Sequence, residues 1–399
     1  MEQTKTDSRN LICWYGTPPQ VSAGGAAASA KHWPGKVIFL CDRRLGSFRK
    51  QVGWEDCDYP GVELVYLSDV DNPAQCVADI VKNNPHAIHF YSGMMYQGRL
   101  WHLLEEHVMP EPDTPIMLGS ELPGIWGNWY KKCLRFFFLG IKNRIIAIKY
   151  AKRINALLPY GITGVKKFHS YGWPLKQLFP YMYCPRFQFL PPPPPRTDNT
   201  VRFVYIGRFR FSTKGVDLLM KAFDALTGKN WTLDLVGGHG EQREQVISWA
   251  EHHPQVTFKG FCPSHEITTL LQNYDVAIVP SRFDGWNPIP NEAAAAGIGV
   301  IASDAAVSDE ITFASGAGLV FPAGDYKALQ QCIETVLNNP RITEEWKQKI
   351  VQYRDRVSPE TVGKYLNQVL QYVADGDLSD LASRPECPWL LPEQQIRLE

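Results

Sequence analysis

Short apolar runs bounded by turn residues recur through the second half of the chain and alternate with segments of helix length. The runs are rich in valine and isoleucine and predict strands at residues 203–206, 232–236, 256–258, 276–279 and 300–302. The segments that predict helices are residues 216–226, 246–252, 267–272, 291–296 and 326–338. Strands that alternate with helices in this way predict parallel βαβ units in a doubly wound sheet.

The first half of the chain has a less regular pattern of the same type. It predicts strands at residues 11–14, 36–40, 62–67, 87–91 and 115–118. We therefore expect an α/β protein with two doubly wound domains.

A proline-rich stretch separates the two halves. Residues 191–200 begin with five consecutive prolines and predict a stiff polyproline II linker, with a surface turn as the alternative. The predicted domains are residues 1–190 and 201–356. The remainder, 357–399, holds an amphipathic helix at 359–373 that we expect to return and pack on the first domain.

Composition narrows the class of protein without identifying a function. Apolar residues make up 44% of the 399 residues and charged residues 21%, which is typical of a globular protein. Acidic and basic residues number 41 each, so nucleic acid is not an expected partner. The nine scattered cysteines lack a C-x-x-C pair and predict reduced thiols in the cytoplasm without a zinc site. The polar start MEQTKTDSRN predicts no signal peptide.

A loop with two cations follows the strand at 203–206. Arg208 and Lys214 are expected at the carboxyl edge of the sheet, where open α/β sheets bind their ligands. Two fixed cations on one loop suit a diphosphate. The alternative is that both are solvated surface charges.

The strongest local signal is the segment 276–297, in which a buried strand feeds a loop rich in Gly, Asn and Pro, and an alanine run then starts a helix. Backbone N–H groups from Gly285 to Asn291 are expected to form an anion site at the start of this helix. The carboxylates of Asp284 and Glu292 flank that site and could hold sugar hydroxyls. The alternative for Glu292 is compensation of the helix dipole.

Taken together, these motifs resemble the retaining glycosyltransferases of family four, which have the GT-B fold of two Rossmann-like domains facing a cleft. The resemblance covers about 140 residues and rests on Gly207-Arg208, Lys214-Gly215, Gly237-Gly238, Phe258-Lys-Gly260, Tyr274-Asp-Val276, Pro280-Ser281, Asp284 and Glu292 separated by seven residues, and Gly297.

The resemblance implies roles for individual residues. Arg208 and Lys214 would hold the donor diphosphate, and Glu292 the ribose hydroxyls. Asp284 would contact the donor sugar, although the family usually has glutamate there and glycine at the position of Asn287. The remaining implied donor-binding residues are Gly237, Gly238, Gly260, Phe261, Gly285, Trp286, Asn287, Pro288 and Ile289. No cofactor or metal is implied besides the nucleotide-sugar co-substrate.

The first domain adds further candidates by the same resemblance. Residues 18–28 are similar to the family's first glycine-rich loop, so Gly24 and Gly25 are expected near the donor; a flexible surface loop is the alternative. Many members carry a histidine after a strand near the transferred sugar, whereas the strand at 115–118 is followed by Glu121. We expect Glu121 to be a sugar or acceptor contact in its place. His89 is interpreted as a structural core residue.

Residues 129–153 form a basic aromatic segment with no acidic residue. Its cations interrupt it too often for a transmembrane span. An interfacial helix on an anionic membrane is one interpretation, and an ordinary helix with solvated cations is the other.

The resulting hypothesis is a metal-independent retaining enzyme that transfers a hexose from a nucleoside-diphosphate sugar, with UDP favoured, to a hydroxyl of a glycan or lipid-linked acceptor. Such reactions serve the synthesis of cell-surface polysaccharide or lipopolysaccharide, in the cytoplasm or peripherally on the inner face of the cell membrane. The candidate catalytic residues are Asp284, Glu292, Arg208, Lys214 and Glu121. The alternatives are a GT-B epimerase, a silent sugar-nucleotide-binding protein, and a GT-A transferase with a metal on Asp69 and Asp71.

Overall fold

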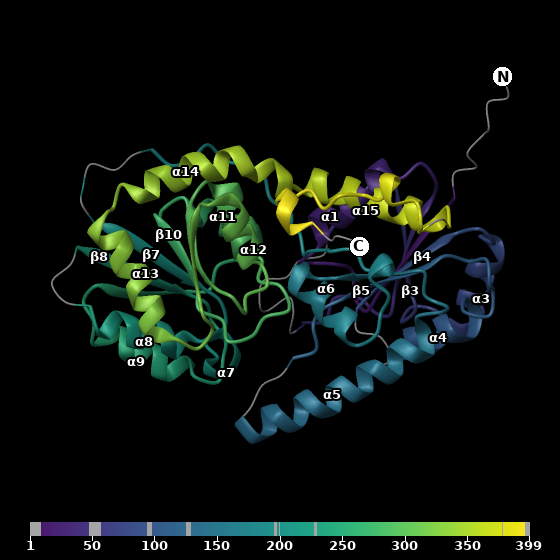
Figure 1. Cartoon of the computed structure of the whole chain (residues 1–399), viewed down its shortest axis with the longest axis horizontal. Coiled ribbons are helices and arrows are strands. Elements are labelled where there is room, and N and C mark those ends of the chain that lie inside the picture. Colours follow the sequence, from purple (N-terminus) through teal and green to yellow (C-terminus); the bar gives the residue numbers. More distant parts are fainter. Residues whose placement is uncertain are drawn as a thin grey trace.

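The computed structural model describes residues 9–47, 57–93, 98–124, 129–194, 198, 200–226, 230–376 and 378–395, with the side chains of 129–137 left out. Two α/β domains lie side by side (Figure 1). Each contains a six-stranded parallel sheet, with the strand orders β3-β2-β1-β4-β5-β6 and β12-β11-β10-β7-β8-β9. This is the GT-B arrangement of two Rossmann-like domains, and the GT-A alternative is therefore wrong.

The first sheet is built from short, mostly buried strands: β1 (Leu11–Tyr15), β2 (Val37–Cys41), β3 (Val62–Tyr66), β4 (Ile88–Ser92), β5 (Ile116–Ser120) and β6 (Ala156–Pro159). Runs that are apolar at every position form strands buried on both faces, as parallel sheets require. The helices of this domain are α1 (Ala23–His32), α3 (Pro73–Asn83), α4 (Arg99–His107), α5 (Trp129–Tyr150) and α6 (Gly161–Ser170).

The second sheet consists of β7 (Val201–Ile206), β8 (Trp231–Val236), β9 (Val256–Gly260), β10 (Val276–Val279), β11 (Gly299–Ser303) and β12 (Gly318–Phe321). Its helices are α7 (Phe211–Lys214), α8 (Val216–Asp224), α9 (Arg243–Glu251), α10 (Ile267–Leu271), α11 (Ile289–Ala296), α12 (Asp309–Ser315), α13 (Tyr326–Asn338) and α14 (Ile342–Tyr353). All ten predicted strands are present. The two that were not predicted, β6 and β12, are four-residue edge strands that end in proline or begin with glycine.

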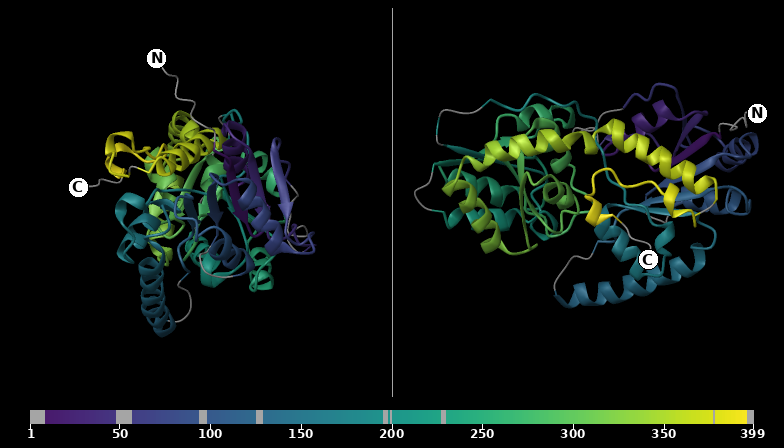
Figure 2. Two further views of the ribbon diagram at one scale, coloured as in Figure 1. Left: turned by 90° about the vertical axis from the view of Figure 1, so that its right-hand side faces the viewer. Right: turned by 45° about the horizontal axis from the view of Figure 1, so that its top comes forward.

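The chain returns to the first domain through α15 (Pro359–Ala374), which packs along α1 (Figure 2). Ser29 Oγ donates to Asn367 Oδ1 at 2.6 Å, and Asn367 Nδ2 donates back to the Ser29 carbonyl at 2.9 Å. Gly363 permits this approach, because a Cβ there would lie 2.5 Å from the backbone nitrogen of Ser29. Helix α15 thus covers α1, which precedes it by more than 300 residues in the sequence.

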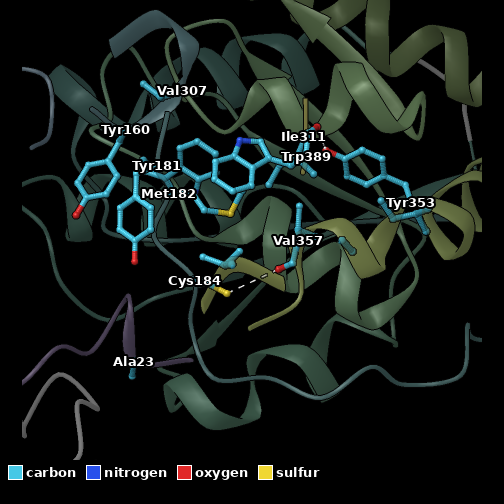
Figure 3. Close-up of a cluster of buried hydrophobic side chains, with 14 of the residues drawn as sticks. Ala23, Tyr160, Tyr181, Met182, Cys184, Val307, Ile311, Tyr353, Val357 and Trp389 are labelled. Carbon is cyan, nitrogen blue, oxygen red and sulfur yellow. Dashed lines mark hydrogen bonds between the residues drawn. The ribbon is translucent and has the colours of Figure 1, made fainter. Parts of the chain in front are cut away.

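A buried hydrophobic cluster joins the two domains (Figure 3). Tyr160 and Met182 contribute from the first domain, Val307 and Ile311 from the second, and Trp389 from the C-terminal segment. Burial of this apolar surface stabilises the contact between the domains. Within the described ranges, no helix combines the length and apolar character needed to cross a membrane.

Candidate functional site

A cavity of about 500 Å³ lies where the carboxyl ends of the second sheet face the first domain. Its size is within the range of small-molecule sites. The second domain lines it with Ile206, Gly207, Arg208, Lys214, Ser264, His265, Ile267, Asn287, Pro288, Ile289 and Glu292. The first domain contributes Gln20, Val21, Ala23, Cys57, Asp58, Pro185 and Arg186. Arg208, Lys214 and Glu292, which were predicted from separate motifs, are therefore brought to one cavity.

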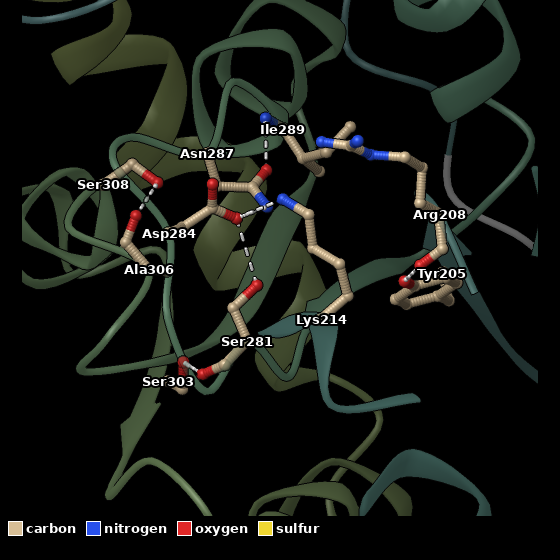
Figure 4. Close-up of polar contacts among 10 residues, drawn as sticks. All are labelled: Tyr205, Arg208, Lys214, Ser281, Asp284, Asn287, Ile289, Ser303, Ala306 and Ser308. Atoms are coloured by element: carbon tan, nitrogen blue, oxygen red, sulfur yellow. Dashed lines mark hydrogen bonds and ion pairs between the residues drawn. The ribbon is translucent and has the colours of Figure 1, made fainter. Parts of the chain in front are cut away.

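The two cations are placed by the turn between β7 and α8. Arg208 follows the end of β7, and Lys214 is the last residue of the short helix α7. Gly215 has φ of 64°, and a Cβ there would lie 1.9 Å from the carbonyl oxygen of Pro280, so only glycine fits the turn. Figure 4 shows the guanidinium of Arg208 extending toward Ile289 at the start of α11.

Glu292 projects from the first turn of α11 and is 4% exposed. Its Oε2 is buried and has no hydrogen-bond partner among the described residues. Burial raises the pKa of this carboxyl to about 8. An unpartnered buried carboxyl on a cavity is costly unless a ligand supplies hydrogen-bond donors, and ribose hydroxyls would do so.

Asp284 was predicted to contact the donor sugar, and one oxygen of its carboxylate is engaged by the protein. The ammonium of Lys214 lies 2.5 Å from Asp284 Oδ2 (Figure 4). The same oxygen accepts from Ser281 Oγ at 3.2 Å and from Asn287 Nδ2 at 3.0 Å. Asp284 is therefore held against Lys214.

The predicted row of backbone donors at the start of α11 is largely wrong. Pro288 and Pro290 have no N–H. The amide of Ile289 donates to Asn287 Oδ1 at 3.0 Å, and that of Asn291 donates to the Pro288 carbonyl at 3.0 Å. The amide of Asn287 donates to the Ala306 carbonyl at 3.2 Å. Most of the expected donors are thus missing or bonded within the protein, and the side-chain cations carry the positive charge of the cavity.

Glu121 follows β5 and lies beside the second domain, against Gly285. It accepts a hydrogen bond from the hydroxyl of Tyr183. Burial raises the pKa of Glu121, and the neighbouring Asp284 raises it further, whereas Tyr183 and Lys214 act in the opposite direction. Glu121 therefore shares an electrostatic environment with the residues of the second domain.

The predicted glycine-rich loop of the first domain is instead the start of helix α1. The amides of Gly24 and Gly25 donate to the carbonyl of Cys184 at 3.0 and 3.2 Å. A Cβ on Gly24 would lie 2.2 Å from the Pro185 carbonyl oxygen, and one on Gly25 would lie 3.2 Å from Val362. These glycines thus pack against protein, and Gln20, Val21 and Ala23 line the cavity in their place.

Trp286, which was also predicted as a donor contact, is buried and donates its indole N–H to Asn291 Oδ1 at 2.9 Å. Gly237 is needed by the fold, because its Cβ would lie 2.1 Å from the Gly207 carbonyl oxygen.

The remaining predicted border of the base site is more open. A Cβ on Gly238 would contact Phe261 at 3.4 Å, and Phe261 is exposed. Gly260 has φ of 75° with no neighbour near its Cβ position. Arg186 is a further cation on the cavity, and no sequence motif surrounds it that would predict this position.

His89 is a core residue, as interpreted from the sequence. It is buried and accepts from the Trp14 indole at 3.0 Å, and burial lowers its pKa to about 3. Asp69 belongs to the rejected GT-A alternative, and it forms an ion pair with Arg44 at 2.6 Å. The part of the chain that the structure describes holds no group of three or more His, Cys, Asp or Glu suited to a metal ion.

Comparisons with known proteins agree with this architecture. Residues 188–353 match the family model of glycosyl transferases group 1. A glycogen synthase of Mycobacterium tuberculosis (strain CDC 1551 / Oshkosh) is 28% identical over 151 residues, which are 37% of this chain and 36% of that protein. The match thus spans about a third of that relative's length.

Solved structures resemble almost the whole chain. Anabaena Alr3699/HepE in complex with UDP and glucose superimposes with a TM-score of 0.66 at 14% identity, covering 91% of this chain and 100% of that one. WaaG, a glycosyltransferase involved in lipopolysaccharide biosynthesis, gives a TM-score of 0.60 at 14% identity, with coverages of 90% and 99%. Residues 188–353 are thus similar to the glycosyl transferases group 1, and the whole chain has the GT-B fold.

Proposed function

We propose that the protein is a retaining glycosyltransferase that moves a hexose from a nucleoside-diphosphate sugar, with UDP as the favoured nucleotide, to a hydroxyl of a glycan or lipid-linked acceptor. The observation that carries the proposal is that Arg208, Lys214 and the unpartnered carboxyl of Glu292 line one cavity. Cations for a diphosphate and a carboxyl for vicinal hydroxyls are the groups that such a donor needs.

The same residues suggest how transfer proceeds. As the glycosidic bond to the diphosphate breaks, negative charge grows on the leaving phosphate. Arg208 and Lys214 stabilise that charge, and electrostatic stabilisation of this kind is usually the largest single contribution to catalysis. Because these cations do what a divalent metal does in other transferases, we expect the reaction to need none and to persist in EDTA. The diphosphate leaves and the acceptor hydroxyl attacks on the same face of the sugar. The anomeric configuration is therefore retained without a protein nucleophile.

The comparisons support the proposed donor class. The HepE structure holds UDP and glucose, and another structure of that protein holds UDP-glucose. WaaG is described as acting in lipopolysaccharide biosynthesis. We extend these properties to this chain as part of the proposal, with cell-surface polysaccharide or lipopolysaccharide as the product.

Calorimetric titration with UDP tests the placement of the diphosphate. Arg208→Ala and Lys214→Ala should each weaken UDP binding by roughly tenfold or more, because each removes a charge-assisted bond. Arg210→Ala is the matched control, since the Arg210 side chain is 40% exposed and pairs with Glu241 at 2.9 Å. UDP binding that is unchanged in both cavity variants would overturn the proposal.

Product analysis by NMR separates transfer from the two alternative activities. A nucleotide sugar epimerised without any acceptor would indicate a GT-B epimerase. A donor that binds but is neither transferred nor hydrolysed, across a panel of glycan and lipid-linked acceptors, would indicate a silent binding protein.

Helix α5 supports a membrane-bound acceptor. Its exposed face carries Phe138, Ile141, Ile145 and Ile148, which are 63%, 44%, 60% and 79% exposed and follow helical spacing. Lys142 and Lys149 line the same shallow surface. Figures 1 and 2 show α5 along one edge of the molecule, beside the first domain. An apolar face with cations beside it fits the interface of an anionic bilayer, so we propose peripheral binding to the inner face of the cell membrane.

Flotation with vesicles tests this surface directly. The wild type should float with vesicles that contain phosphatidylglycerol and less with neutral phosphatidylcholine vesicles. The double variant Ile145→Ser with Ile148→Ser should abolish flotation. Phe313→Ser on α12 is the control and should not, although Phe313 is 64% exposed, close to the 60% of Ile145. A wild type that stays unbound to the anionic vesicles would exclude the membrane partner.

A further inference from the structure

Glu121 reaches across the boundary between the domains and lies directly over Gly285. A Cβ built on Gly285 would be 2.3 Å from Glu121 Oε2 and 2.6 Å from its Cδ. Any other residue at 285 would therefore push the Glu121 carboxyl away. The glycine keeps open the position that Glu121 occupies, between the loop after β10 and the first domain.

Tyr183 fixes the orientation of this side chain. Its hydroxyl donates to Glu121 Oε1, and its ring packs against Tyr160 with a centroid distance of 4.3 Å. Among the described residues, Oε2 accepts no hydrogen bond, and it lies against Gly285. One oxygen of Glu121 is thus held by protein and the other remains available to a hydroxyl donor.

Asp284 is held more firmly than Glu121. Its Oδ2 receives hydrogen bonds from Lys214, Ser281 and Asn287, so this oxygen is engaged by three donors of its own domain. The side chains of the Lys214–Asp284 pair are 18% and 13% exposed, and a mostly buried ion pair that loses one partner leaves an uncompensated charge. This favours a role in holding Lys214 over a role in binding sugar.

We infer that Glu121 is the carboxylate that accepts hydrogen bonds from hydroxyls of the transferred sugar, and that Asp284 is a positioning residue for Lys214. The inference rests on the proposed function and assigns the sugar end of its site. A donor with its diphosphate at Arg208 and Lys214 directs its sugar past Lys214, toward Asp284, Gly285 and Glu121. The sugar-binding carboxylate thus comes from the first domain, and the sugar end of the site is complete only when the domains meet.

Paired titrations with UDP and UDP-glucose test the assignment, because the two ligands differ only by the sugar. Glu121→Gln keeps the size of the side chain and an acceptor for Tyr183. It should weaken UDP-glucose binding by roughly tenfold while UDP binding changes by less than about twofold. Asp284→Asn should change the affinity for both ligands by the same factor, because it acts through Lys214. Thermal unfolding of both variants reports whether they fold.

The contrary results are equally distinct. An equal loss of both ligands in Glu121→Gln would make Glu121 a domain contact only, and no loss in either would remove it from the site. A selective loss of UDP-glucose in Asp284→Asn would return the sugar to Asp284. A wild type that binds neither ligand would instead count against the proposed function.

Discussion

The indole nitrogen of Trp389 donates to Glu310 Oε1 at 2.9 Å, and the other oxygen of that carboxyl accepts from the amide of Ile162 at 2.9 Å. One buried side chain of the second domain therefore bonds both the C-terminal segment and the first turn of α6 in the first domain. Arg384 extends this connection, because its guanidinium donates to the carbonyls of Lys176 and Leu178 at 2.9 and 2.6 Å. The segment after α15 thus fastens the two domains to each other.

Trp389→Phe should lower the free energy of unfolding by about 1–3 kcal/mol, because it leaves a buried carboxyl oxygen without a donor. The measurement is chemical denaturation followed by circular dichroism. Trp249→Phe is the matched control, since the Trp249 indole donates to the exposed Asp224 at 2.7 Å; its cost should stay below about 0.5 kcal/mol. Equal costs in the two variants would show that the bond to Glu310 stabilises no more than a surface contact.

The affinity for UDP should depend on pH through Glu292. The pKa of this carboxyl is raised to about 8, so the free protein carries it protonated at neutral pH. Ribose hydroxyls donate best to the ionised form, and binding should therefore release a proton below pH 8. The affinity should rise with pH between about 6.5 and 8, by at most about tenfold per unit, and level off above.

The same shift acts on stability with a defined sign. A carboxyl whose pKa is raised on folding holds its proton more tightly in the native state than in the unfolded chain. The free energy of unfolding should therefore fall as the pH rises from about 4.5 to about 8. Glu292→Gln should flatten both the binding profile and this part of the stability profile. Glu251→Gln, at an exposed position on α9, should leave both unchanged.

Gly24 should tolerate no side chain, for a reason unrelated to the donor. A Cβ would overlap the Pro185 carbonyl oxygen, so Gly24→Ala should lower the unfolding free energy by more than about 1 kcal/mol. Gly16→Ala has nothing within 4 Å of its Cβ position and should change stability little. Thermal unfolding without nucleotide distinguishes the two. If Gly24→Ala were as stable as the wild type but bound UDP poorly, the glycine would serve the donor after all.

The sequence allowed the sheets and the edge that carries the site to be predicted, because buried parallel strands appear as continuous apolar runs. Arg208 and Lys214 could be placed for the same reason, since residues that follow parallel strands meet at one edge. The edge strands β6 and β12 escaped prediction because each is a short run that contains a turn residue, with Pro159 at the end of β6 and Gly318 at the start of β12.

Contacts between distant segments could not be read from local pattern. The sequence places Glu121 after a strand, but only the packing of the domains brings it over Gly285. The glycines at 24 and 25 suggested a loop near a phosphate, whereas Cys184 and Pro185 occupy that space. The start of α11 suggested free amides, yet Asn287 folds back and bonds one of them. Each difference arises from a side chain or backbone that lies far away in sequence or turns back on its own loop.

Asn287 provides the sharpest test of this last difference. Its buried amide bonds Asp284 and the N–H of Ile289, so Asn287→Ala should lower the unfolding free energy by about 1–3 kcal/mol. The variant also releases the Ile289 amide at the start of α11, on the cavity wall, where it can donate to a phosphate oxygen. UDP should therefore bind more tightly to a less stable protein. Asn83→Ala, at an exposed position, controls for loss of a surface amide. A parallel loss of stability and UDP affinity would show that Asn287 itself contacts the donor.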